Sequence, residues 1–168
     1  IYTLSLHDAL PIYQPAKVED FEELEQAGYE KDMGDMIMDK PHLIEEGFTP
    51  TAREYSVEHG FIDILGKDDD NNLMVLELKA RKAGVSAVKQ LKRYLSDFEN
   101  TENDYLKECK ASKKRIRGLL VAPSLGEDAK EMIEDEGIEF VSIEPPKELR
   151  RDKKTTLDAR LVDRKSVV

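Results

Sequence analysis

The spacing of apolar residues predicts four helices in this chain. Between residues 30 and 40, Met33, Met36 and Ile37 recur at helical spacing, and Pro41 favours a helix end directly after them. The same reading predicts further helices at 84–98, at 126–136 and, more weakly, at 100–110.

Short apolar runs bounded by polar turns predict five strands, at 53–58, 61–66, 73–80, 116–122 and 138–143. The run 73–78 (LMVLEL) is apolar except for Glu77, which is typical of a central strand buried on both faces. The last two strands are separated by a helix, in a βαβ-like arrangement. We therefore predict an α/β fold with a mixed β-sheet flanked by helices.

The polar segment 67–72 (KDDDNN) lies between the second and third predicted strands and suits the loop of a hairpin. A Ca²⁺ loop of the EF-hand type would need spaced ligands, a central glycine and a terminal glutamate between two helices. The segment lacks these features, so we interpret it as a solvated turn.

The composition fits one compact domain, because 39% of the 168 residues are hydrophobic and 37% are charged. The sequence has no apolar run of the roughly 18 residues that a membrane helix needs. Its single cysteine, Cys109, has no partner for an internal disulfide. We therefore expect a cytoplasmic protein without a membrane segment.

The charge is distributed unevenly along the chain. A net charge of −10 would by itself argue against a nucleic-acid partner. However, the stretch from Lys79 to Arg93 contains six basic side chains and no acidic one, and Lys110 to Arg117 adds five more. Charge alone leaves two interpretations open, a solvated basic face and a phosphate-binding surface.

The two ends differ in character from the rest of the chain. We interpret residues 1–12 (IYTLSLHDALPI) and 161–168 as translated sequencing-adapter sequence, since 1–12 also lacks the basic start of a signal peptide. Residues 13–27 are predicted to be a linker remnant, which could end in a short helix, 28–147 the folded domain, and 148–160 a flexible basic tail.

Three residues of the second and third strands suggest a catalytic centre. Glu77 and Lys79 are two positions apart in one strand, so they project together while Leu78 packs on the other face. If the two strands form a hairpin, Asp63 can meet Glu77. Two carboxylates and an ammonium group would then share one pocket.

Such a pair of carboxylates suits a hard divalent cation, because Mg²⁺ binds a few carboxylate oxygens and keeps water molecules that also reach a substrate phosphate. The metal would stabilise the transition state of phosphodiester hydrolysis, and Lys79 would orient the attacking water. Taken alone, the Glu77-x-Lys79 motif also fits a buried ion pair without catalytic function.

The three residues of this centre belong to a series of motifs that occur in the order Gly60-x-x-Asp63, Glu77-x-Lys79 and Gln90-x-x-x-Tyr94. The first two motifs lie on the two predicted strands and the third on the helix that follows. Together they resemble the motifs of the RecB-like branch of the PD-(D/E)xK nuclease superfamily. The resemblance implies a restriction-endonuclease-like core. It also implies that Lys79 assists the water and that Gln90 and Tyr94 order the site and the nucleic-acid backbone.

The same resemblance implies a third acidic ligand on a helix before the sheet. Glu30 is the residue that matches, with Asp32 and Asp35 as less favoured competitors. The metal ligands implied are therefore Glu30, Asp63 and Glu77, and the cofactor implied is Mg²⁺ or Mn²⁺.

A closer resemblance covers about residues 30–147. The blocks EKDMGDMIMDKPHLIEEGF, HGFIDILG, VLELKARKAGVSAVKQLKRYL, RGLLVAPSL and GIEFVSIEPP are similar to those of the C-terminal nuclease domain of the NucS/EndoMS mismatch endonucleases. The resemblance implies metal-dependent cleavage of both DNA strands near mismatches, in DNA repair. It implies DNA, a second copy of the protein and the sliding clamp as partners.

Two departures from that family limit what we expect of this polypeptide. The family has an N-terminal DNA-binding and dimerisation domain, for which 13–27 supplies at most a linker, so the isolated fragment is expected to bind DNA weakly and to have little activity. The segment 153–158 resembles the start of the clamp-binding peptide, but Ala159, Arg160 and Leu161 follow instead of its aromatic pair. We therefore expect a truncated clamp-binding motif.

Two other functions stay open at this point. One is a RecB-like nuclease that cuts single-stranded or flap DNA. The other is a non-catalytic DNA-binding or clamp-interacting module, whose signature would be the loss of an acid or of Lys79, and none is lost.

Other reactive side chains carry weaker signals. His42 and His59 are too isolated for a zinc site, so surface or helix-end roles are expected. Cys109 lacks the pattern of His and Asn partners that is typical of a nucleophilic cysteine. The sequence does not decide whether Arg53 and Glu54 support the centre from an adjacent strand.

Overall fold

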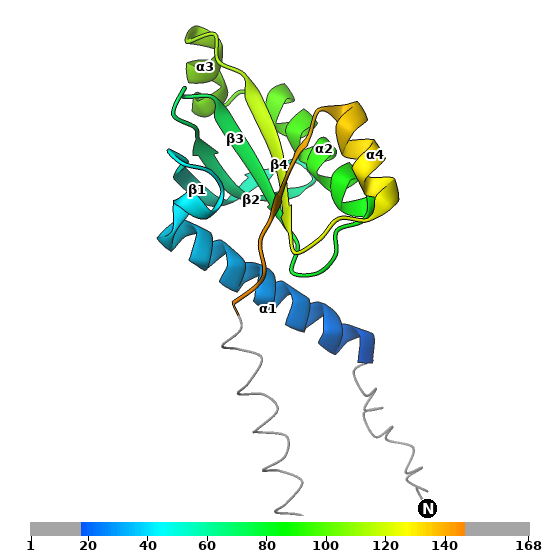
Figure 1. The fold of residues 1–168 in the computed structure, drawn as a ribbon. Coiled ribbons are helices and arrows are strands. Elements are labelled where there is room, and N and C mark those ends of the chain that lie inside the picture. The colour runs from blue at the N-terminus through cyan, green and yellow to red at the C-terminus, as the bar shows by residue number, and fades with distance from the viewer. Residues whose placement is uncertain (1–17, 147–168) are drawn as a thin grey trace, which may run out of the picture.

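The computed structural model describes residues 18–146, with side chains from residue 24 onward. A five-stranded sheet carries helices on both faces (Figure 1). The elements are α1 (Val18–Asp39), η1 (Pro41–Leu43), β1 (Thr49–Val57), β2 (Gly60–Lys67), β3 (Leu73–Leu78), α2 (Val85–Asn100), α3 (Asp104–Ala111), β4 (Ile116–Ala122), α4 (Glu127–Glu136) and β5 (Glu139–Ser142).

The sheet has the order β1-β2-β3-β4-β5 and is mixed. β1, β2 and β3 pair antiparallel, whereas β3, β4 and β5 pair parallel. β3 lies at the centre, and all six of its residues are buried. The predicted α/β fold, the 67–72 hairpin and the buried central strand are therefore confirmed.

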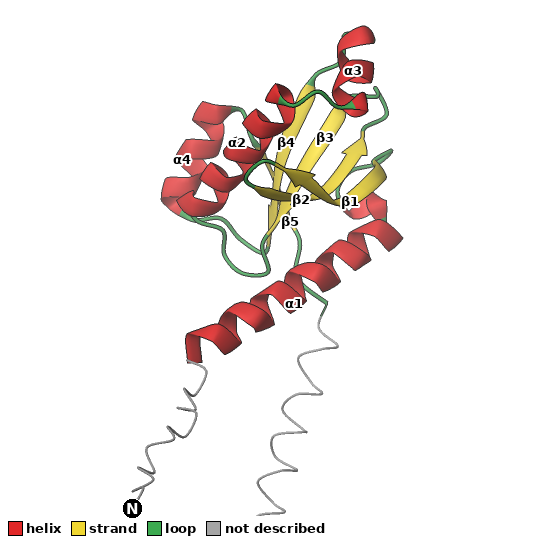
Figure 2. Ribbon diagram, turned by 180° about the vertical axis from the view of Figure 1, so that it is seen from behind, coloured by secondary structure: helices red, strands yellow, loops and turns green. Residues whose placement is uncertain are grey.

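The helices lie on both faces of the sheet (Figure 2), and two apolar clusters hold them there. On one face, Val88 and Leu91 of α2 and Ala129 of α4 pack with residues of β2, β3 and β4. On the other face, Met33 and Ile37 of α1 pack against the sheet. Successive side chains of each strand point alternately to the two clusters, and this alternation determines the face of the sheet on which each side chain near a strand end lies.

The observed start of α1 differs from the predicted one. The helix begins at Val18 rather than at residue 30, because the preceding acidic stretch is rich in helix-forming residues and contains no proline. The predicted linker is therefore helical from Val18 onward. This outer part is not packed on the sheet, as Leu24 is 71% exposed, so the stretch lacks the apolar stripe that predicts a helix.

At the strands and at α3 the causes of the differences are local. β1 begins at Thr49 because Pro50 is tolerated in an edge strand, where the register shifts between Pro50 and Ala52. α3 is a separate helix from α2 because the side chain of Asn103 accepts a hydrogen bond from Leu106 N and caps a new helix.

A cluster of charges centred on Arg117 joins three parts of the fold. Its guanidinium donates hydrogen bonds to Glu45 after η1, to Asp68 in the β2–β3 turn and to Glu139 of β5. Asp68 also accepts hydrogen bonds from the backbone and the side-chain amide of Asn72, which closes the turn. The turn is thus a structural element, in agreement with its interpretation as a hairpin loop.

The predictions made for 1–12, for 13–17, for the tail 148–160 and for 161–168 lie outside the described residues. Within the described part, none of the helices is long and apolar enough to cross a membrane.

Candidate active site

The centre of the site lies at the C-terminal end of β3, which carries Glu77, beside the middle of β2, which carries Asp63. The β2–β3 register pairs Ile64 with Leu76, and its continuation places Asp63 opposite Glu77. Asp63 Oδ2 accepts a hydrogen bond of 2.7 Å from Leu78 N, which holds the carboxylate against β3. The structure thus brings Asp63 and Glu77 together, as the hairpin predicts.

Glu77 has an unusual environment for a carboxylate. The residue is only 1% exposed, and Lys79 Nζ donates a hydrogen bond of 2.6 Å to its Oε1. Its Oε2 is buried and has no hydrogen-bond partner in the described part of the chain. Leaving such an oxygen without a partner costs on the order of 1–3 kcal/mol, so an ion pair that only satisfies itself does not account for it.

Glu30 is the acidic residue of α1 that reaches this centre. Its Oε1 accepts hydrogen bonds from Ala80 N, just after β3, at 3.3 Å and from Gln26 Nε2 at 3.1 Å. Of its two competitors, Asp35 instead forms an ion pair with Arg53. The structure therefore favours Glu30 as the third carboxylate.

Burial and mutual repulsion shape the titration of these groups. Burial, opposed by the hydrogen bond from Leu78 and by Lys79, raises the pKa of Asp63 to about 6. Burial and then the Asp63 charge raise the pKa of Glu77 to about 8, against the attraction of Lys79. Burial would lower the pKa of Lys79, but Glu77, Glu30 and Asp63 together raise it above its ordinary value.

These residues fit a hard divalent cation. The candidate ligands are carboxylate oxygens of Glu30, Asp63 and Glu77, among them the Oε2 of Glu77, which has no partner among the described residues. A cation among them would satisfy that oxygen and remove the repulsion that raises both pKa values.

Gln90 and Tyr94 form a separate pair on α2. Gln90 Nε2 donates a hydrogen bond of 3.0 Å to the Tyr94 hydroxyl, and the ring of Tyr94 is buried. The hydroxyl lies close to Gly60 at the start of β2, where an added Cβ would come within 2.5 Å of it. Among the described residues no hydrogen bond joins this pair to the three carboxylates, so its link to the centre runs through β2.

Replacing Gly60 by alanine is expected to destabilise the protein by about 1–3 kcal/mol, because φ is +149° there and the new methyl group would collide with Tyr94. Thermal unfolding measures the loss. Gly28→Ala is the matched control, since Gly28 lies inside α1 with no atom within 4 Å of a new Cβ, and it should stabilise by about 0.5–1 kcal/mol. A Gly60→Ala protein as stable as the parent would contradict the tight contact.

Arg53 supports the site from β1, a role that the sequence left undecided. Its guanidinium pairs with Asp35 and donates to Lys31 O, so it ties β1 to α1. Its charge also lowers the pKa of Asp63. Gly34 permits this approach, because a Cβ there would lie 2.3 Å from the guanidinium. No structural support from the side chain of Glu54 is evident, although its backbone has φ of +49°.

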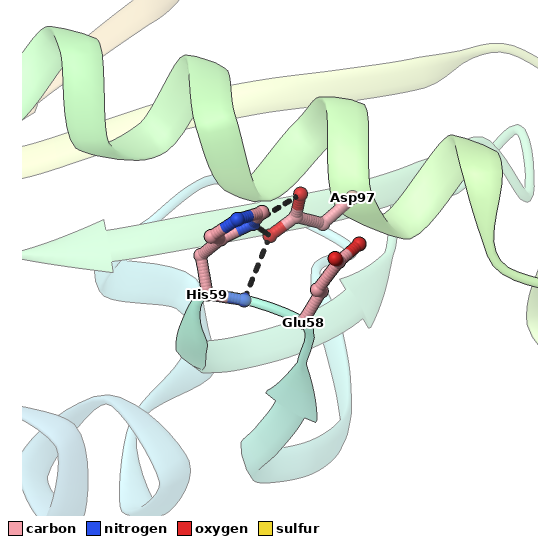
Figure 3. Close-up of side chains that lie close together, drawn as sticks. All are labelled: Glu58, His59 and Asp97. Carbon is pink, nitrogen blue, oxygen red and sulfur yellow. Dashed lines mark hydrogen bonds and ion pairs between the residues drawn. The ribbon is translucent and has the colours of Figure 1, made fainter.

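Where the β1–β2 turn meets α2, the structure also brings together Glu58, His59 and Asp97, whose metal-ligand atoms all lie within 4.8 Å of one another (Figure 3). The buried carboxylate of Asp97 is bound by His59 N at 3.0 Å and by His59 Nδ1 at 2.9 Å. Through these hydrogen bonds the group joins the β1–β2 turn to α2, a structural role that explains why the three side chains lie together. The surface role expected for His59 is consistent with this arrangement.

Comparisons with known proteins place the chain in a family. It matches the endonuclease NucS C-terminal domain over residues 29–160. It is 49% identical to Endonuclease NucS of Pyrococcus abyssi over 142 residues, covering 83% of this chain and 53% of that protein. With Endonuclease NucS of Methanocaldococcus jannaschii it shares 45% identity over 136 residues, which cover 81% of this chain and 48% of that protein. The chain thus spans about half the length of these relatives.

Solved structures agree with the sequence comparison. A repair endonuclease from Pyrococcus abyssi superposes with a TM-score of 0.60 at 45% identity, over 70% of this chain and 47% of that one. An EndoMS–dsDNA2 complex superposes with a TM-score of 0.60 at 42% identity, and the match covers 70% of this chain and 45% of that chain. The predicted resemblance is confirmed, and the chain belongs to the family of the endonuclease NucS C-terminal domain.

Proposed function

We propose that this chain forms the cutting centre of a DNA endonuclease that hydrolyses phosphodiester bonds with a divalent metal ion, Mg²⁺ or Mn²⁺. The observation that carries the proposal is the buried, partnerless Oε2 of Glu77 beside Asp63, Glu30 and Lys79. A fold-stabilising ion pair would leave no oxygen unsatisfied, whereas a metal site needs one.

In the proposed mechanism Glu30, Asp63 and Glu77 hold the cation, which would supply Lewis-acid activation of the phosphate and lower the pKa of a water molecule. Lys79 carries a positive charge held 2.6 Å from Glu77, where it can orient the attacking water and stabilise charge that develops on the phosphate. Gln90 and Tyr94 keep β2, and with it Asp63, in place against α2. These roles follow the PD-(D/E)xK resemblance and are part of the proposal.

The family supports a more specific role. Its members are named endonucleases, one solved neighbour is described as a repair endonuclease, and another is a complex with double-stranded DNA. We therefore propose double-strand cleavage directed to mismatches, in DNA repair, by a protein in which two copies of the domain act together. Clamp binding belongs to the same proposal for a longer protein, and the cytoplasmic location stays a prediction.

A metal titration tests the proposal. Calorimetry of the chelator-treated chain is expected to detect binding of Mn²⁺, and more weakly of Mg²⁺, and Asp63→Asn should weaken both by about tenfold or more, because a direct ligand loses its charge. Nicking of supercoiled plasmid at high protein concentration should require the same metals. Equal metal affinity in parent and variant would remove the basis of the proposal.

Asp70→Asn is the matched control for that titration. Asp70 is an exposed member of the acidic 67–72 turn, the segment that could be mistaken for a Ca²⁺ loop. Its replacement removes the same charge from the chain and should leave metal affinity unchanged. If Asp70→Asn weakened binding as much as Asp63→Asn, the cation would be bound in the turn or without specificity.

A further inference from the structure

The two basic stretches of the sequence lie at opposite ends of the central strand. In the parallel β3–β4 pair, Leu73 faces Ile116 and Leu78 faces Val121. The stretch 110–117 therefore enters the sheet at the Leu73 end, whereas the stretch 79–93 leaves it beside Glu77. At about 3.3 Å per residue, these ends are roughly 15 Å apart. Only the stretch 79–93 adjoins the proposed cutting centre.

The cations of α2 in that stretch are not equivalent. Lys92 forms an ion pair of 2.5 Å with Glu136 of α4 and is therefore neutralised within the fold. Lys89 and Arg93 are exposed, and neither has an ion pair with any described residue. They are four positions apart, where two like charges destabilise a helix by about 0.2–0.5 kcal/mol. No carboxylate among the described residues pairs with either charge to offset this repulsion, which points to an anion from outside.

Arg93 has one possible acid on its own helix face, and that acid is already bound. Asp97 lies four residues further along α2, but His59 occupies its carboxylate through the backbone N–H and the ring (Figure 3). The Arg93 guanidinium instead lies 5.5 Å from the ring centre of Tyr94. Arg93 is therefore held next to the Gln90–Tyr94 pair without being neutralised.

We propose that Lys89 and Arg93, together with Arg81 just after Lys79, form a stripe that binds the phosphate backbone of duplex DNA as it enters the cutting centre. Arg81 is likewise exposed and without an ion pair among the described residues. A chain with a net charge of −10 repels DNA at long range, so attraction has to come from local positive charge. That the bound DNA is also the cleaved substrate rests on the proposed function.

Binding of a short fluorescent DNA duplex at several salt concentrations tests the stripe. The measurement is made by anisotropy in chelator, so that no DNA is cut. Each phosphate interaction that a substitution removes makes the slope of log K against log salt shallower by about 0.9. We expect Lys89→Gln and Arg93→Gln each to flatten the slope by about that amount, and the double variant by about twice as much, with affinity several-fold lower for each substitution.

Two controls remove the same positive charge elsewhere. Lys92→Gln changes the paired cation of the same helix, and Lys113→Gln changes an exposed lysine at the far end of the sheet. Both should keep the parent slope. The proposal is overturned if the double variant keeps the parent slope, if the controls flatten it equally, or if the parent does not bind the duplex at low salt.

This measurement is independent of the cutting chemistry. Duplex binding in chelator does not need the metal site, so a failed metal titration with normal slopes would overturn the proposed function and leave the stripe. Normal metal-dependent nicking with no effect of Lys89 or Arg93 on the slope would overturn the stripe alone. Free inorganic phosphate as competitor distinguishes a general anion site, which it would saturate, from a surface that needs a polymer.

Discussion

Glu77→Gln is expected to abolish metal-dependent cleavage, lowering the rate by about a thousandfold or more. The substitution keeps the shape of the side chain and removes the charge of the buried, proposed metal ligand, and a loss of about 4 kcal/mol in transition-state stabilisation corresponds to a thousandfold in rate. Nicking of supercoiled plasmid by excess protein, with Mn²⁺ or Mg²⁺, measures the effect. Glu131→Gln, in an exposed position of α4, should cleave like the parent. Parent-like cleavage by Glu77→Gln would refute the assignment.

The same variant should be more stable than the parent when no metal is present. The pKa of Glu77 is raised to about 8 in the folded state from an ordinary 4.5, so the folded state binds the proton more tightly than the unfolded chain does. Stability of the parent therefore falls as the pH rises from about 4.5 to about 8, and the Glu77→Gln variant lacks this dependence. Melting temperatures in chelator at pH 5 and pH 8 should show the advantage of the variant growing with pH.

Arg117→Met is expected to cost about 3 kcal/mol of stability, the second large effect. The change leaves the partly buried Asp68 carboxylate without its cation and releases Glu45 and Glu139, so that η1, the β2–β3 turn and β5 lose their common partner. For a domain of this size the melting temperature should fall by about 10 °C. Arg115→Met, an exposed neighbour with no side-chain ion pair among the described residues, should change stability by less than about 0.5 kcal/mol.

Lowering the pH should reduce the difference in stability between Arg117→Met and the parent. Hydrogen bonds from Arg117 lower the pKa of Glu139; burial would raise the pKa of Asp68, but hydrogen bonds from Asn72 and Arg117 lower it. Groups with a lowered pKa stabilise the fold above their ordinary values, here 4.5 and 3.8, and lose that contribution as the pH falls through the folded-state values. A difference that stayed constant from pH 7 to pH 3 would show that charge is not the cause.

Local sequence patterns predicted the sheet half of the site well. The hairpin of β2 and β3 follows from two apolar runs around a polar turn, and the alternation of strand residues then brings Glu77 beside Lys79 and Asp63 opposite Glu77. β4 has the boundaries that its apolar run predicts. These features depend on neighbours close in sequence, which periodicity describes.

The remaining parts depend on contacts between distant residues. Nothing in the pattern of α1 singles out Glu30 from Asp32 or Asp35; the family resemblance did, and the choice is visible in space because Glu30 reaches Ala80 and Asp35 reaches Arg53. The sequence likewise counts Arg117 within a basic stretch, whereas the fold neutralises it with carboxylates from three other segments.

The origin of the three carboxylates has a consequence for the order of events during synthesis. Asp63 and Glu77 belong to one hairpin and can meet early, but Glu30 joins them only when α1 docks, through a hydrogen bond that spans fifty residues of sequence. Contacts of such separation form late, because a long loop has to be closed first. In a polypeptide that is still folding, the proposed metal site is therefore incomplete, and on the proposed function a newly made chain would acquire the capacity to break DNA only once its tertiary structure is finished.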